Sequence, residues 1–439
     1  MPYGTPSINE QASVMTTAGV AWAATSKSHV WLLIGSGVVA AAQIGKAVIS
    51  VPLIRADLGL GLDLAGLIVG IFAILGAACG VGAGVVVQCI GPRRSLVGGM
   101  ICIAIGNLIG SQAPNEWYLL VARITEGVGF LGVVLAIPTL LAVSIERERR
   151  DFVMALWSAY MPAGITLVMI VAPLVAVIGW RNLWLASACI AAVCALLLRL
   201  AAPATPMPTH SQRVRWIDDL ATVICNPDCL VLAFAFFAFS CQMFSMTFAL
   251  PLILTSVHGL SVGQAGLASA AMLAMATLGH VSCSLLLRSG IPIWVNVAAA
   301  FLLFGLAPFA VYTTAAPLFA TMVFAALALG IGGLAPGALY AAAPQVAPHE
   351  TSLPSTIGLL QQASNLGQFA GPLVIGVWVQ NFGWDVVPAI TVPAALFGFI
   401  AALLIRDVLS ARKTEALDHR KGKEELQTKC QSRSEGARP

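Results

Sequence analysis

Long apolar runs are the feature of this sequence that most limits its fold. They recur from about residue 30 to residue 406, and a helix needs about 20 apolar residues to cross the hydrocarbon core of a membrane. Of the 439 residues, 59% are hydrophobic and only 10% are charged, and the mean hydropathy is +0.90. A soluble chain carries about 25% charged residues and cannot bury this much apolar surface. The composition therefore excludes a cytosolic enzyme, a nucleic-acid-binding protein and a secreted disulfide scaffold.

The runs predict an all-α membrane protein, because a β-barrel would alternate apolar and polar residues in short segments. We expect twelve transmembrane helices in two six-helix pseudo-repeats. The predicted spans are 30–54, 63–88, 95–112, 117–143, 153–178, 182–200, 229–255, 264–287, 292–312, 316–345, 354–380 and 385–406. The predicted parts of the chain are an N-terminal tail (1–28), the first bundle (29–200), a linker (201–228), the second bundle (229–406) and a disordered tail (407–439).

Basic residues set the expected orientation. With twelve spans and both termini inside, nineteen of the 23 Lys and Arg residues lie on the cytoplasmic side. Only Arg55 and Arg181 fall in outer loops, and two more lie within spans. This bias follows the positive-inside rule. It predicts a multi-pass protein of the inner or plasma membrane with cytoplasmic termini.

Several motifs resemble those of the major facilitator superfamily, and the resemblance covers essentially the whole chain. After the second span, the family pattern G-x-x-x-D-x-x-G-R-[RK]-[RK] is matched in part by GVVVQCIGPRR at 84–94. The fourth span contains RITEGVG at 123–129, and the fifth runs from Gly164 through Pro173 to the pair Trp180-Arg181. A short echo, APLV at 172–175 and GPLV at 371–374, also relates the fifth and eleventh spans. Within the superfamily, QIGK at 43–46 and RITEG at 123–127 are similar to the branch of cyanate and nitroimidazole permeases.

The resemblance implies a secondary transporter in which two bundles rock around a central cavity, lined in part by the first and fourth helices of each half. The loop at 84–94 would be the gating loop, and the residues that fit the pattern are Gly84, Gly91, Arg93 and Arg94. Gln88 replaces the acidic residue and Pro92 the first basic one, so the usual role of charge in this gate is in doubt.

Three charged residues lie well inside predicted spans: Lys46, Arg123 and Glu126. Charges within a bilayer are expensive and usually functional. Arg123 and Glu126 are three residues apart and share a helix face, so they are expected to form an ion pair. Lys46 would then be a lone cation that an anionic solute neutralises. Alternatively, Glu126 takes up a proton and frees Arg123 for the anion, which predicts proton coupling through Glu126.

Uncharged polar side chains form further stripes at helical spacing. Such amides suit a polar solute, although they also join helices to one another. Together with the two cations, the amides give the predicted substrate-binding residues Lys46, Gln43, Arg123, Gln242, Gln361, Asn365 and Gln368.

We therefore predict a transporter that moves a small anionic or weakly acidic solute with protons. Its partners would be the solute, protons and the lipid bilayer, and it would be a monomer with no cofactor, metal centre or nucleic-acid partner.

Three alternatives stay open. The Gly/Pro motif of the fifth span is similar to that of exporters of drug-like or siderophore compounds. A receptor that signals through its tail is the second. Copper(I) uptake is the third, because soft ligands gather at Cys241, Met243, Met246, Met272, Met275, His280 and Cys283.

Overall fold

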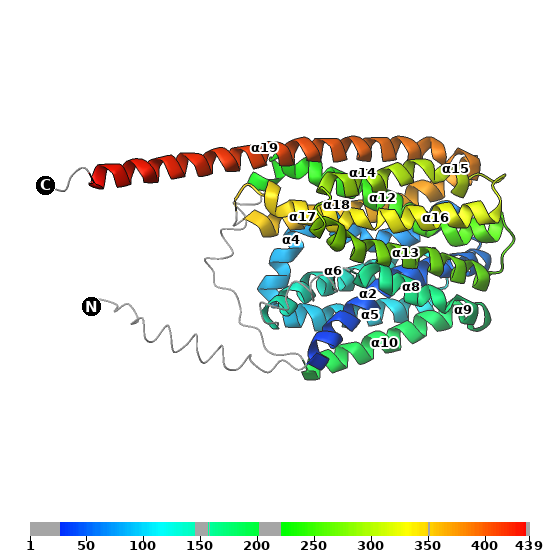
Figure 1. Ribbon diagram of the computed structural model, residues 1–439. Coiled ribbons are helices and arrows are strands. Elements are labelled where there is room, and N and C mark those ends of the chain that lie inside the picture. The colour runs from blue at the N-terminus through cyan, green and yellow to red at the C-terminus, as the bar shows by residue number, and fades with distance from the viewer. Residues whose placement is uncertain (1–26, 145–156, 158, 202–220, 350–351, 436–439) are drawn as a thin grey trace, which may run out of the picture.

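Helices build the protein throughout the part described by the computed structural model, which comprises residues 27–144, 157, 159–201, 221–349 and 352–435. No strand occurs within these residues. Most of the predicted N-terminal tail and most of the predicted linker lie outside them, and α2 begins at Lys27, within the predicted tail. Figure 1 shows the helices side by side as one elongated bundle, with the start of α2 and the end of α19 at the same end.

The N-terminal half contains eight α-helices in the described residues. They are α2 (Lys27–Leu58), α3 (Leu62–Gly70), α4 (Ile74–Ile90), α5 (Pro92–Ser111), α6 (Glu116–Ser144), α8 (Tyr160–Ile170), α9 (Ala172–Ile178) and the longer α10 (Trp180–Ala201), of which α8 and α9 form one bent unit. A 3₁₀ turn, η1 (Ile71–Ala73), joins α3 to α4.

The C-terminal half repeats this pattern. Its helices are α12 (Pro227–Ser256), α13 (Val262–Arg288), α14 (Ile293–Leu306), α15 (Pro308–Val311), α16 (Leu318–Gly332), α17 (Leu334–Val346), α18 (Leu353–Phe382) and α19 (Pro388–Glu435), with the 3₁₀ turn η3 (Trp384–Val386) before α19.

Most predicted spans correspond to these helices, and local chemistry explains where they break. Ten helical segments of the described chain are long and apolar enough to cross a membrane, and α8 with α9 makes eleven. That pair bends by 48° near Pro173, because proline removes a helical N–H. Helix α18 is not among the eleven although it is 30 residues long, since its amide side chains lower its hydropathy. The count of twelve therefore stays a prediction.

The C-terminal tail differs from its predicted state. We expected residues 407–439 to be disordered, but α19 continues as a helix to Glu435 and projects beyond the bundle (Figure 1). The segment is rich in Ala, Leu, Glu, Lys, Arg and Gln, which have high helix propensity, and it extends a helix that is already nucleated in the bundle.

The two halves meet along two seams in the described structure. In one, α13 packs on α8 and α9. In the other, α18 packs on α3 and α4, and glycines allow the backbones to approach closely. Two hydrogen bonds fasten this second seam: the Leu62 N–H donates to Gln380 Oε1 (2.8 Å), and Gln362 Nε2 donates to the Ala77 carbonyl (2.9 Å). We call it the α4–α18 seam below.

A matched pair of glycines tests this seam. A methyl group at Gly80 would lie 2.8 Å from Gln362 Cβ and 3.0 Å from its Cα, whereas one at Gly82 has nothing within 4 Å. We expect Gly80→Ala to lower the stability by about 1–3 kcal/mol through overpacking, and Gly82→Ala to change it by at most about 0.5 kcal/mol. Thermal unfolding of the purified protein in detergent measures both. Equal midpoints for the two variants would show that the seam is open in solution.

Candidate functional site

The three charged residues singled out in the sequence meet in one place. Lys46 projects from α2, and Arg123 and Glu126 project from neighbouring turns of α6. All three side chains are fully buried, with 0% of their surface exposed. We call this cluster the charged triad.

One carboxylate serves both cations. Glu126 Oε1 lies 2.7 Å from Lys46 Nζ, and Glu126 Oε2 pairs with Arg123 Nη1. The predicted Arg123–Glu126 pair thus forms, but the expectation that Lys46 would be a lone cation is wrong. The reason is that α2 and α6 pack together, so both cations reach the same carboxylate. With all three groups ionised, the triad keeps one unneutralised positive charge.

Two residues that the sequence analysis missed complete the surroundings of Lys46. Asn107 of α5 accepts a hydrogen bond from Lys46 Nζ (2.5 Å) and donates one to Gln43 Oε1 (2.9 Å). Trp184 of α10 presents its ring to the ammonium group, 3.7 Å from Nζ to the ring centroid, a cation–π arrangement. Asn107 is an amide within a largely apolar span, and this feature of the sequence marks it as a candidate polar contact. No comparable signal marks Trp184 in the sequence.

Arg123 is held mainly by backbone carbonyl groups. Its Nε donates to the carbonyl of Ile68 (3.1 Å), and its Nη1 donates to the carbonyl of Gln43 (3.0 Å). The guanidinium carbon lies 4.4 Å from the centroid of the Phe72 ring, which belongs to η1. Nη2 is buried and has no hydrogen-bond partner among the described residues. An orphaned donor on a buried cation is costly, so this atom is open to an acceptor.

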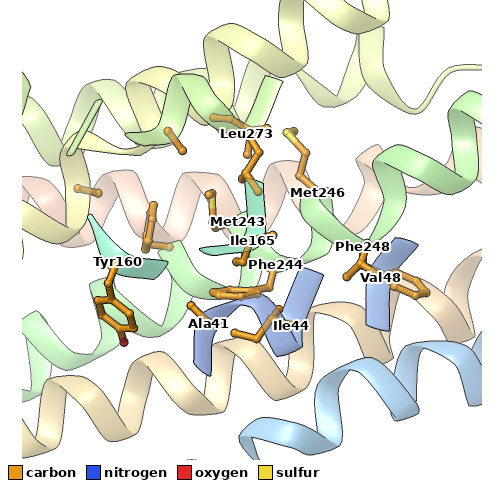
Figure 2. Close-up of a cluster of buried hydrophobic side chains, with 14 of the residues drawn as sticks. Ala41, Ile44, Val48, Tyr160, Ile165, Met243, Phe244, Met246, Phe248 and Leu273 are labelled. Atoms are coloured by element: carbon orange, nitrogen blue, oxygen red, sulfur yellow. The ribbon is translucent and has the colours of Figure 1, made fainter. Parts of the chain in front are cut away.

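Helix α2 separates the triad from the contact between the halves. Gln43, Lys46 and Ser50 lie on the face of α2 that looks into the N-terminal half, and all are buried. Figure 2 shows the opposite face, where side chains of α2 and α8 meet those of α12 and α13 in one apolar cluster. We call it the inter-half cluster; its labelled members are Ala41, Ile44, Val48, Tyr160, Ile165, Met243, Phe244, Met246, Phe248 and Leu273.

The candidate amides of the C-terminal half do not join the triad, and most are engaged. Gln242 Nε2 donates to the Thr391 carbonyl (2.5 Å), which ties α12 to α19. Gln361 Oε1 accepts from the Tyr340 hydroxyl (2.7 Å). Asn365 Nδ2 donates to the Gln361 carbonyl (2.9 Å), and its side chain lies against Gly76 of α4 in the α4–α18 seam. Gln368 Nε2 donates to Ser364 Oγ (3.3 Å), but its Oε1 is buried without a partner in the described structure.

The residues of the predicted gating loop hold the turn between α4 and α5. Gly91 has φ +96°, which a residue with a side chain rarely adopts. Arg93 Nη2 donates to the carbonyl of Arg199 (2.7 Å) near the end of α10, so this contact stays within the N-terminal half. Arg94 is exposed. The surroundings of the Gly84 position and of the Gln88 side chain lie outside the described part of the structure.

The copper alternative gains no support from the described residues. They contain no group of three or more His, Cys, Asp and Glu residues placed to hold a metal. His280 Nδ1 lies 2.8 Å from the Ala276 carbonyl one turn earlier in α13, which is a local hydrogen bond. A copper route would therefore have to depend on methionine sulfurs.

The importance of the shared carboxylate can be measured against a surface ion pair. Glu126→Gln leaves two buried cations without an anion, and breaking a buried pair in this way costs about 3–5 kcal/mol. Asp57→Asn removes the partner of Arg181, a pair whose side chains are 40% and 42% exposed, and should cost about 0–1 kcal/mol. Chemical or thermal unfolding in detergent compares the two variants. A Glu126→Gln protein as stable as Asp57→Asn would mean that the triad is not ionised as drawn.

Comparisons with known proteins bear on the fold as a whole. The model of the Major Facilitator Superfamily matches residues 32–313 and 293–433. Two crystal structures of a bacterial homolog of the human lysosomal transporter Spinster are similar in fold. Its inward-facing, unoccupied form has a TM-score of 0.65 at 16% identity, covering 88% of this chain and 94% of that one. Its inward-facing, occupied form has a TM-score of 0.64 at 15% identity, covering 88% and 96%.

No curated protein sequence matched the chain. The finer similarity to cyanate and nitroimidazole permeases is not tested by these comparisons and stays a prediction. The family match extends over both halves and agrees with the predicted all-α membrane fold. The chain belongs to the Major Facilitator Superfamily and is a multi-pass membrane transporter of small solutes.

Proposed function

We propose that the protein moves a weakly acidic organic solute together with protons, by alternating access, and that the charged triad is its coupling centre. The observation that carries this proposal is the sharing of one buried carboxylate by two buried cations. An unneutralised charge at this depth is unfavourable. A solute anion close to the triad would neutralise it, so the site favours anions over neutral or cationic compounds.

Arg123 is the group through which we expect the acid to bind. Its Nη2 is the one guanidinium nitrogen without a partner among the described residues. Hydrogen bonds between a guanidinium and a carboxylate are short and about twice as strong as neutral ones. A carboxylate at Nη2 would satisfy both the free donor and the excess charge.

The inter-half cluster favours an apolar body for the same solute. Ile44 and Val48 lie on α2 within one turn of Lys46, and they meet Phe244 and Phe248 of α12 (Figure 2). Ligand sites are mostly apolar with a few well-placed polar groups. Because α2 lies between the two, the solute would meet this apolar contact and the charged triad at different stages of transport.

The region around η1 could link the rocking of the two halves to the exposure of Arg123. The Ile68 carbonyl and the Phe72 ring cover Arg123 on one side. Helix α3, which carries Ile68, also packs on α18 through Gly66 and Gly70. A 3₁₀ turn within a helix often marks a hinge. Separation of α18 from α3 would therefore move the cover of Arg123.

The expected setting of the protein follows from the same proposal. It would act as a monomer in the inner or plasma membrane with both termini in the cytoplasm. Gln242 and Gln361 would contact the solute only by giving up their hydrogen bonds to the Thr391 carbonyl and the Tyr340 hydroxyl.

One other function has an observation in its favour. The inter-half cluster is apolar and contains methionines and phenylalanines, which suits export of neutral drug-like compounds. In that case the triad would serve only to hold α2, α5 and α6 together.

Benzoate and benzamide distinguish these two functions, because they share one shape and differ in charge. We expect benzoate at saturating concentration to raise the unfolding temperature of the purified protein and benzamide to have little effect. A ligand at 100 times its Kd stabilises by about 2.7 kcal/mol. Arg123→Lys should abolish most of the benzoate effect, since lysine lacks the planar fork of donors. Arg181→Lys, which alters the exposed cation, is the matched control. Equal shifts by the acid and the amide, unchanged in Arg123→Lys, would favour export of neutral compounds.

A further inference from the structure

We propose that the coupling proton moves on and off Lys46, and that Glu126 stays ionised as the fixed anion of the triad. This inference rests on the proposed function, in which the triad couples proton movement to the solute. It differs from the expectation that Glu126 itself carries the proton.

The charge balance of the triad argues against a proton on Glu126. Its Oε1 faces Lys46 Nζ and its Oε2 faces Arg123 Nη1. Ammonium and guanidinium groups are donors without acceptors. A protonated carboxyl group at this position would lose the charge-assisted part of both contacts. It would also leave two buried cations without an anion.

Arg123 is also unsuited to release a proton. A guanidinium stays charged in proteins, and this one donates to two backbone carbonyls as well as to Glu126. Arg123 and Glu126 therefore form a permanent neutral pair. Lys46 is the remaining group of the triad whose charge can change.

Lys46 is placed so that both of its protonation states are satisfied. A neutral amine has two N–H bonds, and two acceptors face Nζ: Glu126 Oε1 at 2.7 Å and Asn107 Oδ1 at 2.5 Å. An ammonium group has a third N–H, and the face of the Trp184 ring lies 3.7 Å away in the remaining direction. Trp184 holds the cation by a cation–π contact, whereas its ring face gives no hydrogen bond to the lone pair of the neutral amine, so Trp184 responds differently to the two states.

The helices packed around Lys46 bring few other groups that ionise. In the described structure α6 supplies Glu126 and Arg123, α5 supplies Asn107 and α10 supplies Trp184. Helix α8 packs on the other side of α2, where Gly45 faces Ile165. The charge of the triad therefore depends on Lys46 alone: it is +1 with the ammonium and zero with the amine.

This arrangement couples one proton to one monovalent anion. When an N–H bond of the Lys46 ammonium breaks, the proton passes to water and the electron pair stays on Nζ, so the triad loses its attraction for an anion. When Nζ takes up a proton, the triad regains its charge and binds the solute. The loaded and the empty carrier then have the same net charge in the buried site, which lowers the barrier to rocking in both states.

Trp184 provides a test on the protein without any ligand. The difference in fluorescence between the wild type and Trp184→Phe isolates its emission, which we expect to change with pH as Lys46 gains or loses its charge. Lys46→Arg fixes the cation and Lys46→Met fixes the neutral state, so both should lose this titration. Glu126→Gln should retain a titration, displaced along the pH axis because the anion beside Lys46 is lost. The proposal is overturned if Lys46→Arg still titrates while Glu126→Gln does not, or if the wild type shows no Trp184 titration.

A second measurement does not depend on the folding of variants at position 46. NMR spectra of wild-type protein with ¹³C-labelled lysine should show one lysine resonance that titrates apart from the exposed ones and that moves when Trp184 is replaced by phenylalanine. If every lysine titrates together, Lys46 does not change its charge and the proposal fails. Both measurements omit the solute. A failure of the Lys46 titration with benzoate still bound would reject only this inference. A Lys46 that titrates in a protein that does not bind benzoate would reject only the proposed function.

Discussion

The bidentate position of Glu126 between Lys46 and Arg123 is the interaction on which the interior of the N-terminal half depends. One carboxylate joins α2 to α6, and its two cations recruit Asn107 of α5, Trp184 of α10 and the Ile68 carbonyl of α3. Five helices are thus tied to one buried anion. Desolvation makes each of these charges expensive by itself, so the cluster is stable only as a unit, and a change in the charge of one member is felt by all of them.

The two faces of α2 relate the charged triad to transport, because one face contacts the triad and the other contacts the C-terminal half. Lys46 of the charged triad lies on one face of α2, and the inter-half cluster lies on the opposite face (Figure 2). On a second side, η1 stands between Arg123 and the α4–α18 seam, where glycines let the two halves approach through their backbones. The charge of the triad and the packing of the halves therefore meet at the same two elements, α2 and η1. That arrangement allows protonation to be linked to rocking without direct contact between the triad and the C-terminal half.

Much of the fold and part of the site could be predicted from the sequence. Apolar runs gave nearly every membrane helix, because a lipid environment leaves few alternatives to a helix. The rarity of charge within those runs identified Lys46, Arg123 and Glu126, and the i, i+3 spacing gave the Arg123–Glu126 pair. The second partner of Glu126 could not be predicted, because Lys46 lies 80 residues away along the chain. The helical continuation of α19 could not be predicted from its charged composition, which is typical of disorder, although the same residues have high helix propensity.

The sequence by itself determined that this chain crosses a membrane repeatedly and that few of its charges are buried, since hydropathy and residue spacing are local properties. Only the tertiary structure decided which way those charges point. The predicted substrate-binding residues Gln43 and Lys46 lie on a face of α2 that meets the interior of the N-terminal half in this conformation. A helical stripe records which residues share a face, whereas the packing of neighbouring helices determines what that face meets. The same packing brought Asn107 and Trp184 to Lys46 and left Arg123 Nη2 without a partner among the described residues.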